Sequence, residues 1–154
     1  MSNFVERFKN ELENEKLTLQ SFSKITGISS SQLSKYASGF YEPSLKNAII
    51  ICNSFSCSID YLCGLNKDRN NFGALKSENV ELFFKRFNNL LKINNTNINR
   101  VSKHTSINRN CIYHWQNKHL FPKLGILIKL SIELHTNIEY LIGRTDVMEI
   151  SYGI

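Results

Sequence analysis

The chain carries an internal repeat with a period of 79 residues, and this repeat constrains the fold more than any other feature. A shift of 79 positions aligns residues 4–64 with residues 83–143 without a gap, and 16 of the 61 aligned positions are identical. The clearest pair is "SIDYLCGL" (58–65) and "NIEYLIGR" (137–144). A repeat of this length is one structural unit present twice, so we expect two similarly folded domains.

Positions that differ between the two copies keep the same physical role. Side chains able to cap a helix N-terminus recur at three places in each copy. They are Thr18, Ser29 and Ser58 in the first copy and Asn97, Asn108 and Asn137 in the second. The apolar spacing between them is helical, and no alternating strand pattern competes with it. The sequence therefore predicts an all-α protein with five short helices in each copy, the fourth opening at Pro43 or Pro122.

The repeat also predicts the domain boundaries. We expect a first domain over residues 1–65, a linker over the polar segment 66–80, a second domain over 81–146 and a C-terminal tail over 147–154. Neither the roughly 18 apolar residues of a membrane span nor the apolar region of a signal peptide is present. We therefore expect a cytoplasmic protein with no membrane contact.

Basic residues are distributed unevenly between the copies. Residues 1–65 carry six basic and six acidic side chains, whereas the whole chain has a net charge of +6. No acidic residue occurs between Glu81 and Glu133, a stretch that contains nine Lys or Arg. This pattern favours a polyanionic partner, and nucleic acid is favoured over membrane because no strongly amphipathic basic helix stands out.

Catalytic and metal-binding chemistry are not indicated by the sequence. The four Cys residues form no C-x-x-C pair, and the four His residues fall in separate predicted helices or loops with no paired spacing. A zinc site needs three or four convergent ligands, and catalysis needs a positioned base with its partner. We expect no metal, no cofactor and no enzymatic activity.

A series of short motifs runs through the first copy. Residues 17–65 contain T-x-x-x-F-S, G-I-S, L-S-K-Y, P-S-L and S-I-D-Y-L-C-G in that order, and residues 97–146 repeat the series more loosely and end in E-Y-L-I-G-R-T-D. Both stretches resemble the DNA-binding domain of Cro/cI-type (Xre) repressors. The resemblance implies two tandem five-helix, lambda-repressor-like helix-turn-helix domains, each with its third helix in the major groove. Leu19 and Ile98 depart from the family, which usually has Gln there.

The resemblance also implies which residues contact DNA. Base-reading positions lie on the third helix of each copy; they are Ser30, Ser31, Gln32 and Lys35 in the first and Arg109, Asn110, Tyr113 and His114 in the second. Arg pairs bidentately with guanine and Asn with adenine, each contact discriminating by about 1–3 kcal/mol. Phosphate contacts are expected from the second helix and from the loop after the third; these residues are Lys24, Ser38, Lys46, Arg100, Lys103, Asn117, Lys118, His119 and Lys123.

Two hypotheses of different classes follow. The favoured one is a sequence-specific transcription regulator that binds a double-stranded DNA operator, with a repressor of the phage or mobile-element kind as the expected role. The alternative is a protein-binding inhibitor or antirepressor that uses the fold as a scaffold, in which the basic second domain alone binds DNA and the first takes a protein partner. A homodimer formed through exposed apolar residues is favoured over a monomer; candidates are Phe40, Tyr41, Leu120 and Phe121.

Overall fold

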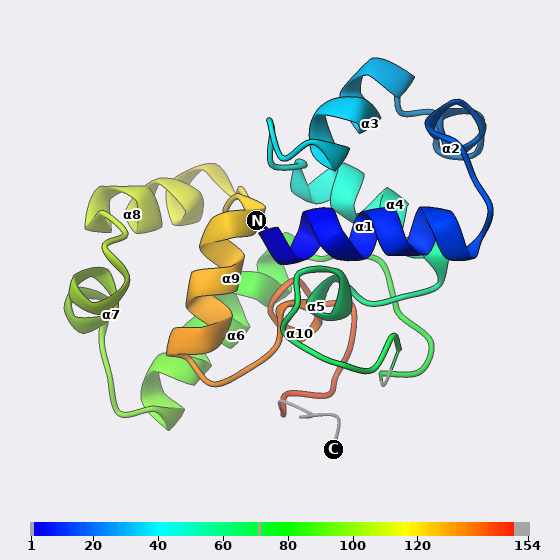
Figure 1. The fold of residues 1–154 in the computed structure, drawn as a ribbon. Coiled ribbons are helices and arrows are strands. Elements are labelled where there is room, and N and C mark those ends of the chain that lie inside the picture. Colours follow the sequence, from blue (N-terminus) through cyan, green and yellow to red (C-terminus); the bar gives the residue numbers. More distant parts are fainter. Residues whose placement is uncertain (1, 71, 150–154) are drawn as a thin grey trace. The chain divides into compact units, whose positions relative to one another are not determined.

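Every regular element in the part of the chain that the structure describes is a helix, so the prediction of an all-α protein is confirmed (Figure 1). The computed structural model describes residues 2–70 and 72–149. The predicted C-terminal tail extends beyond these ranges, and residues 150–154 lie outside them. The chain divides into a first compact unit that ends at residue 71 and a second that begins at Phe72. None of the described helices has the length and apolar character needed to cross a membrane.

The helices follow the repeat. In the first unit they are α1 (Ser2–Asn14), α2 (Leu19–Thr26), α3 (Ser30–Ala37), α4 (Leu45–Phe55) and α5 (Ile59–Leu62). In the second unit they are α6 (Val80–Ile93), α7 (Ile98–Thr105), α8 (Arg109–Lys118), α9 (Leu124–Glu133) and α10 (Ile138–Leu141). Helices α7 to α10 begin 79 residues after α2 to α5, whereas α8 has 10 residues and α3 has 8.

The helix starts are set by side-chain caps. All six predicted N-caps accept a hydrogen bond from a backbone N–H in the first turn of the following helix; they are Thr18, Ser29, Ser58, Asn97, Asn108 and Asn137. The prediction that Pro43 and Pro122 open a helix is wrong by two residues. Helix α4 begins after Ser44, whose hydroxyl accepts a 3.1 Å hydrogen bond from the Asn47 N–H, so the proline precedes the cap.

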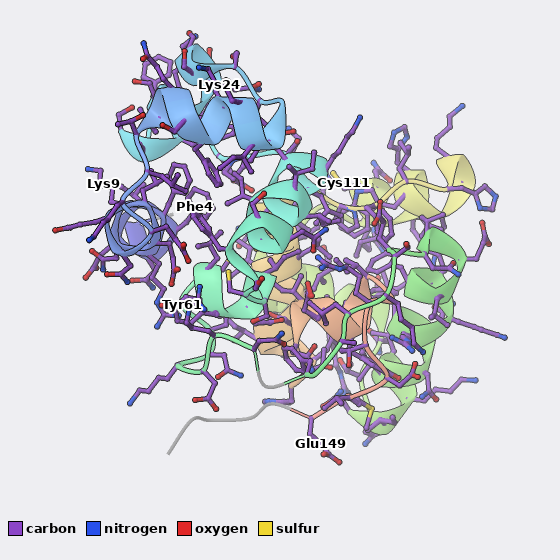
Figure 2. The ribbon with its side chains drawn as sticks, turned by 90° about the vertical axis from the view of Figure 1, so that its right-hand side faces the viewer. Phe4, Lys9, Lys24, Tyr61, Cys111 and Glu149 are labelled. Carbon is purple, nitrogen blue, oxygen red and sulfur yellow. The ribbon has the colours of Figure 1, made fainter. Side chains whose placement is uncertain are left out.

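Aromatic rings fill the core of the first unit. Phe4 points from α1 into the unit, whereas Lys9 on the same helix points away (Figure 2). Phe22 and Phe55 stack with their ring centroids 4.7 Å apart, and Phe8 packs against both. The side chains at the repeat positions of Phe22 and Phe55 are the buried Val101 and Leu134. The two cores are therefore filled differently on the same helical frame.

One arginine joins the first helix of the first unit to the segment at its end. The Arg7 guanidinium on α1 donates through Nη1 to the backbone carbonyl of Tyr61 and, at 2.6 Å, to that of Asn66. It also lies 4.4 Å from the centroid of the Tyr61 ring. Burial raises the pKa of the Tyr61 phenol, and the neighbouring Glu11 carboxylate, which accepts its hydrogen bond at 3.2 Å, raises it further. Arg7 thus ties the first helix to the end of the unit.

The second unit repeats this contact. Arg86 Nη1 donates to the carbonyls of Tyr140 at 2.6 Å and Thr145 at 2.7 Å, and the guanidinium lies 4.0 Å from the Tyr140 ring centroid. Its Nη2 reaches Asp146 Oδ1 at 2.9 Å. Hydrogen bonds from Lys76 and Arg86 lower the pKa of the Asp146 carboxyl below its usual value. Arg86, Tyr140 and Thr145 are 79 residues beyond their counterparts, so the repeat extends to individual hydrogen bonds.

The segments that follow α5 and α10 also correspond, although their sequences differ. The Asp68 N–H donates to Asn66 Oδ1 at 2.9 Å, and the Val147 N–H donates to Thr145 Oγ1 at 3.2 Å. Asn and Thr side chains both form such local turns with a backbone N–H two residues later. A comparison that counts only identical residues therefore misses this similarity between the two units. The Ser58 N–H donates to the Arg69 carbonyl at 2.7 Å, so the start of the predicted linker is folded onto the first unit. The predicted domain boundaries stay a prediction.

Replacing Arg86 with Ala is expected to destabilise the second unit by about 2–4 kcal/mol, because two carbonyls lose a charged donor. Trp115, the single Trp of the chain, lies in this unit and reports its unfolding by fluorescence in urea. Lys85→Ala, an adjacent exposed position, serves as the control and should change the midpoint little. Equal midpoints for the two variants would contradict the role given to Arg86.

Candidate nucleic-acid interface

The turn between α2 and α3 is held by local hydrogen bonds. Thr26 Oγ1 donates to the Phe22 carbonyl at 2.8 Å and accepts from the Ile28 N–H at 3.2 Å. Gly27 follows the helix with φ of +76°, a left-handed conformation that glycine adopts without strain. Ser29 then caps α3. The two helices are joined by a short, ordered turn.

The corresponding turn of the second unit has the same bonds without the glycine. Thr105 Oγ1 donates to the Val101 carbonyl at 2.6 Å and accepts from the Ile107 N–H at 3.3 Å. Ser106 takes the glycine position with φ of +62°. Asn108 caps α8, and its Oδ1 accepts from the Asn110 N–H at 2.8 Å. The threonine, rather than the glycine, is the shared element of the turn.

Helices α3 and α8 each bury one face and expose the other. Leu33 and Tyr36 of α3 and Ile112 and Trp115 of α8 are all below a tenth exposed. The opposite faces, here called the outer faces, carry every base-reading residue predicted from the sequence, and each is exposed; they are Ser30, Ser31, Gln32 and Lys35 on α3 and Arg109, Asn110, Tyr113 and His114 on α8. The structure thus gathers each predicted set on one solvent-facing surface of its own unit.

A residue of α7 that the sequence did not point to, Asn99, contacts the outer face of α8. Arg109 Nη1 donates to Asn99 Oδ1 on α7 at 2.8 Å. Asn99 directly follows Ile98, which stands where the family usually has Gln, so the neighbouring amide was not expected to contribute. The bond orients the guanidinium at the start of α8 and leaves its other N–H groups for a ligand, since a guanidinium carries five.

The outer face of α3 is chemically simpler. Ser30 and Ser31 offer hydroxyls, which both donate and accept and so discriminate poorly between bases. Lys35 Nζ lies 5.2 Å from the centroid of the Tyr41 ring, in the turn that follows α3. Lys35, the one basic residue of α3, is therefore directed toward the turn.

All predicted phosphate-binding residues are exposed; they are Lys24, Ser38, Lys46, Arg100, Lys103, Asn117, Lys118, His119 and Lys123. One of them has an acidic partner, because His119 Nδ1 lies 2.8 Å from Glu81 Oε1 and the imidazole ring packs edge-on to Phe84. His104 Nδ1 similarly lies 2.7 Å from Glu133 Oε1. The two acids that bound the acid-free stretch therefore each pair with a histidine, and a phosphate at His119 would have to displace Glu81.

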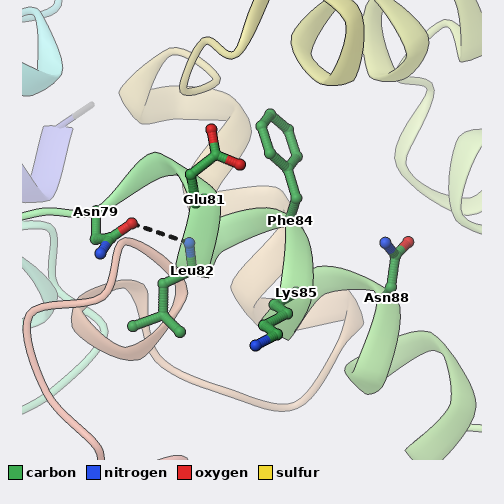
Figure 3. Close-up of a pocket in the computed structure, with 6 residues that line it drawn as sticks. All are labelled: Asn79, Glu81, Leu82, Phe84, Lys85 and Asn88. Atoms are coloured by element: carbon green, nitrogen blue, oxygen red, sulfur yellow. Dashed lines mark hydrogen bonds between the residues drawn. The ribbon is translucent and has the colours of Figure 1, made fainter.

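Hollows occur in the described part of the second unit, and two of them are lined by charged residues. The first runs along one helix, α6, and the residue before it, where Asn79 Oδ1 accepts a 3.1 Å hydrogen bond from the Leu82 N–H (Figure 3). The second is lined by Arg100, His104 and Glu133, among others. Among the described residues, no group of three or more His, Cys, Asp and Glu side chains is placed to hold a metal ion.

Comparison with known families matches residues 8–62 to the helix-turn-helix family. The match runs from Phe8 in α1 to Leu62 in α5, so it includes α2, the turn and α3. It supports the predicted Xre-type domain for this part of the chain, a kind of domain that binds DNA and is not enzymatic. No curated protein and no solved structure matched the chain.

Replacing Asn108 with Ala is expected to destabilise the second unit by about 1 kcal/mol, because the N-cap of α8 is lost. Trp115 lies on the same helix, so its fluorescence during urea unfolding measures the effect. Asn108→Ser keeps a capping oxygen and should retain most of the stability. If the Ala and Ser variants unfold at the same urea concentration, the cap does not stabilise this helix.

Proposed function

We propose, from the premise that residues 8–62 form a helix-turn-helix domain of the DNA-binding kind, that the chain is a sequence-specific transcription regulator acting as a repressor. In this proposal each unit is one such domain, and α3 and α8 enter the major groove of a double-stranded operator. The observation that carries it is the pair of outer faces, in which every predicted base-reading residue is exposed while the opposite face is buried. Occupation of the operator would then exclude RNA polymerase.

The second unit supplies most of the base discrimination in this proposal. Arg109 is held by Asn99 and keeps N–H groups free to pair bidentately with guanine O6 and N7. Asn110 is exposed beside it and has the amide that pairs with adenine N6 and N7. His114 and Tyr113 lie one turn farther along α8 and extend the contact to the following base pairs.

Affinity in the proposed complex comes largely from phosphate contacts. Such contacts release counterions, and the released ions make binding strongly dependent on salt. The second unit has more exposed basic side chains in the expected places than the first: Arg100, Lys103, Lys118 and Lys123 against Lys24 and Lys46. We infer that the second unit contributes the larger share of the binding free energy.

A second candidate function rests on the first unit. Residues 1–65 carry equal numbers of acidic and basic side chains, and the outer face of α3 starts with serines. A protein-binding inhibitor or antirepressor would use this unit to hold a protein partner and only the second unit to hold DNA. The homodimer expected from the exposed apolar residues is compatible with either function and stays a prediction.

The double variant Arg109→Ala, Asn110→Ala is expected to bind a duplex recovered by in vitro selection at least about 30-fold more weakly than wild type, because two base contacts of about 1–3 kcal/mol each are lost. Fluorescence anisotropy measures the affinity, and a repeated selection measures the sequence preference. Lys92→Ala removes a charge from α6 outside the proposed interface and should keep the preference. If the double variant keeps the affinity and the sequence preference of wild type, α8 is not the helix that reads the bases.

Two triple variants of the full chain separate the two candidate functions. Replacing Lys103, Lys118 and Lys123 with Ala is expected to lower the slope of log affinity against log salt by about 2–3, since each phosphate contact contributes about 0.9. The first-unit triple Lys24→Ala, Lys35→Ala, Lys46→Ala is expected to lower it as well, by a smaller amount. If the first-unit triple leaves the slope at the wild-type value, the first unit does not contact DNA and the protein-binding alternative is favoured.

A further inference from the structure

The turn after α3 presents two aromatic rings to solvent. Phe40 is 71% exposed and Tyr41 is 52% exposed. Their ring centroids are 4.8 Å apart at an interplanar angle of 77°, so the rings meet edge to face. We call Phe40 and Tyr41 the aromatic tip.

The aromatic tip is held in place by the last turn of α3. The Phe40 N–H donates to the Lys35 carbonyl at 2.9 Å, and the Gly39 N–H donates to the Tyr36 carbonyl at 3.1 Å. Gly39 has φ of +77°, a left-handed conformation that lets the chain leave the helix sharply. The rings are thus exposed on an ordered turn and need no rearrangement to meet a partner.

The second unit exposes the same two positions, with Leu120 at 48%, but fills them with residues of another kind. At the repeat positions of Phe40 and Tyr41 it has His119 and Leu120, and His119 is paired with Glu81. The aromatic ring of that turn, Phe121, packs on Phe83 with the centroids 5.9 Å apart. Phe121 stands at the repeat position of Glu42, so the pair of exposed aromatic rings belongs to the first unit and has no aromatic counterpart in the second.

The surroundings of the aromatic tip favour a polyanion over a protein or a second copy of the chain. Lys35, a predicted base-reading residue, has its ammonium group 5.2 Å from the Tyr41 ring centroid, so the tip adjoins the proposed DNA surface. Ser38 and Lys46 flank the turn and are exposed. The backbone N–H groups at the N-terminus of α4 add a partial positive charge, and no acidic residue in its first turn offsets it; Glu42 is the one acid within the turn.

We propose that the aromatic tip inserts into the minor groove beside the site of α3, unstacks one base step and bends the duplex. This inference rests on the proposed function. Helix α3 has 8 residues and is about 12 Å long, close to the width of the major groove. If its N-terminus meets base edges, its C-terminal turn therefore meets the sugar–phosphate wall that separates the two grooves. Apolar side chains used as wedges in the minor groove kink DNA in this way.

The insertion would give the first unit a means of discrimination that its serine-rich outer face lacks. Bending DNA costs an amount of free energy that depends on the sequence, and pyrimidine–purine steps are the easiest to kink. The first unit would then select deformable sequence through the aromatic tip, while the second selects bases through Arg109 and Asn110. The two copies of one fold would read two different properties of the operator.

The test uses the full chain and the duplex recovered by in vitro selection. The duplex carries a dye at each end to report bending by energy transfer, and 2-aminopurine replaces one adenine at a time to report unstacking by fluorescence. Wild type is expected to shorten the end-to-end distance and to raise the fluorescence at one step. Phe40→Ala, Tyr41→Ala is expected to abolish both changes and to bind at least about 10-fold more weakly with an unchanged salt slope, because apolar groups release no counterions.

Ile25→Ala is the matched control, since Ile25 is 59% exposed on α2 of the same unit, and it should behave as wild type. The inference is overturned if the tip variant bends and unstacks the duplex as wild type does, or if wild type does neither. It is also overturned if the tip variant changes only the solution mass, which would make the tip a surface for self-association. In those cases the proposed function still predicts that Arg109→Ala loses sequence preference. If in vitro selection enriches no duplex at all, the proposed function itself is contradicted.

Discussion

In each unit, one arginine donates hydrogen bonds to two backbone carbonyls, and these bonds join the first helix of the unit to its end. Arg7 and Arg86 reach from the first helix of their units to the last short helix and the segment after it, and each guanidinium also covers a tyrosine ring. Units of this size bury little apolar surface, so a charged donor that satisfies two carbonyls matters more than it would in a larger domain. In sequence, the other helices of each unit lie between the two segments that this arginine joins.

A shared frame carries different chemistry in the two units. The Thr26 and Thr105 turns have the same hydrogen bonds, and the helices after them bury the same repeat positions. The residues that face solvent are free of this constraint and have diverged. The proposed division of roles follows from this, with Arg109 as a reader of base edges in the second unit and the aromatic tip as a reader of DNA shape in the first.

Local features were predictable because they depend on neighbours in the chain. Asn108 caps α8 through the N–H two residues later, and Ser29 caps α3 through the N–H three residues later, so both helix starts follow from short patterns. The partner of Arg109 was not predictable, since Asn99 lies on another helix and the family pattern drew attention to the position before it. Glu81 and His119 are 38 residues apart in sequence, and no local pattern links them.

The sequence by itself determined that the chain has two similar helical parts, where the helices begin, and which part is basic, because repetition, capping and charge are properties of the chain read in order. Only the tertiary structure decided which aromatic rings are buried. Phe40 and Phe121 stand at different repeat positions in the turns after α3 and α8; Phe121 meets Phe83, whereas Phe40 meets solvent. Whether a ring is buried depends on the side chains that pack against it, and those side chains come from residues distant in sequence.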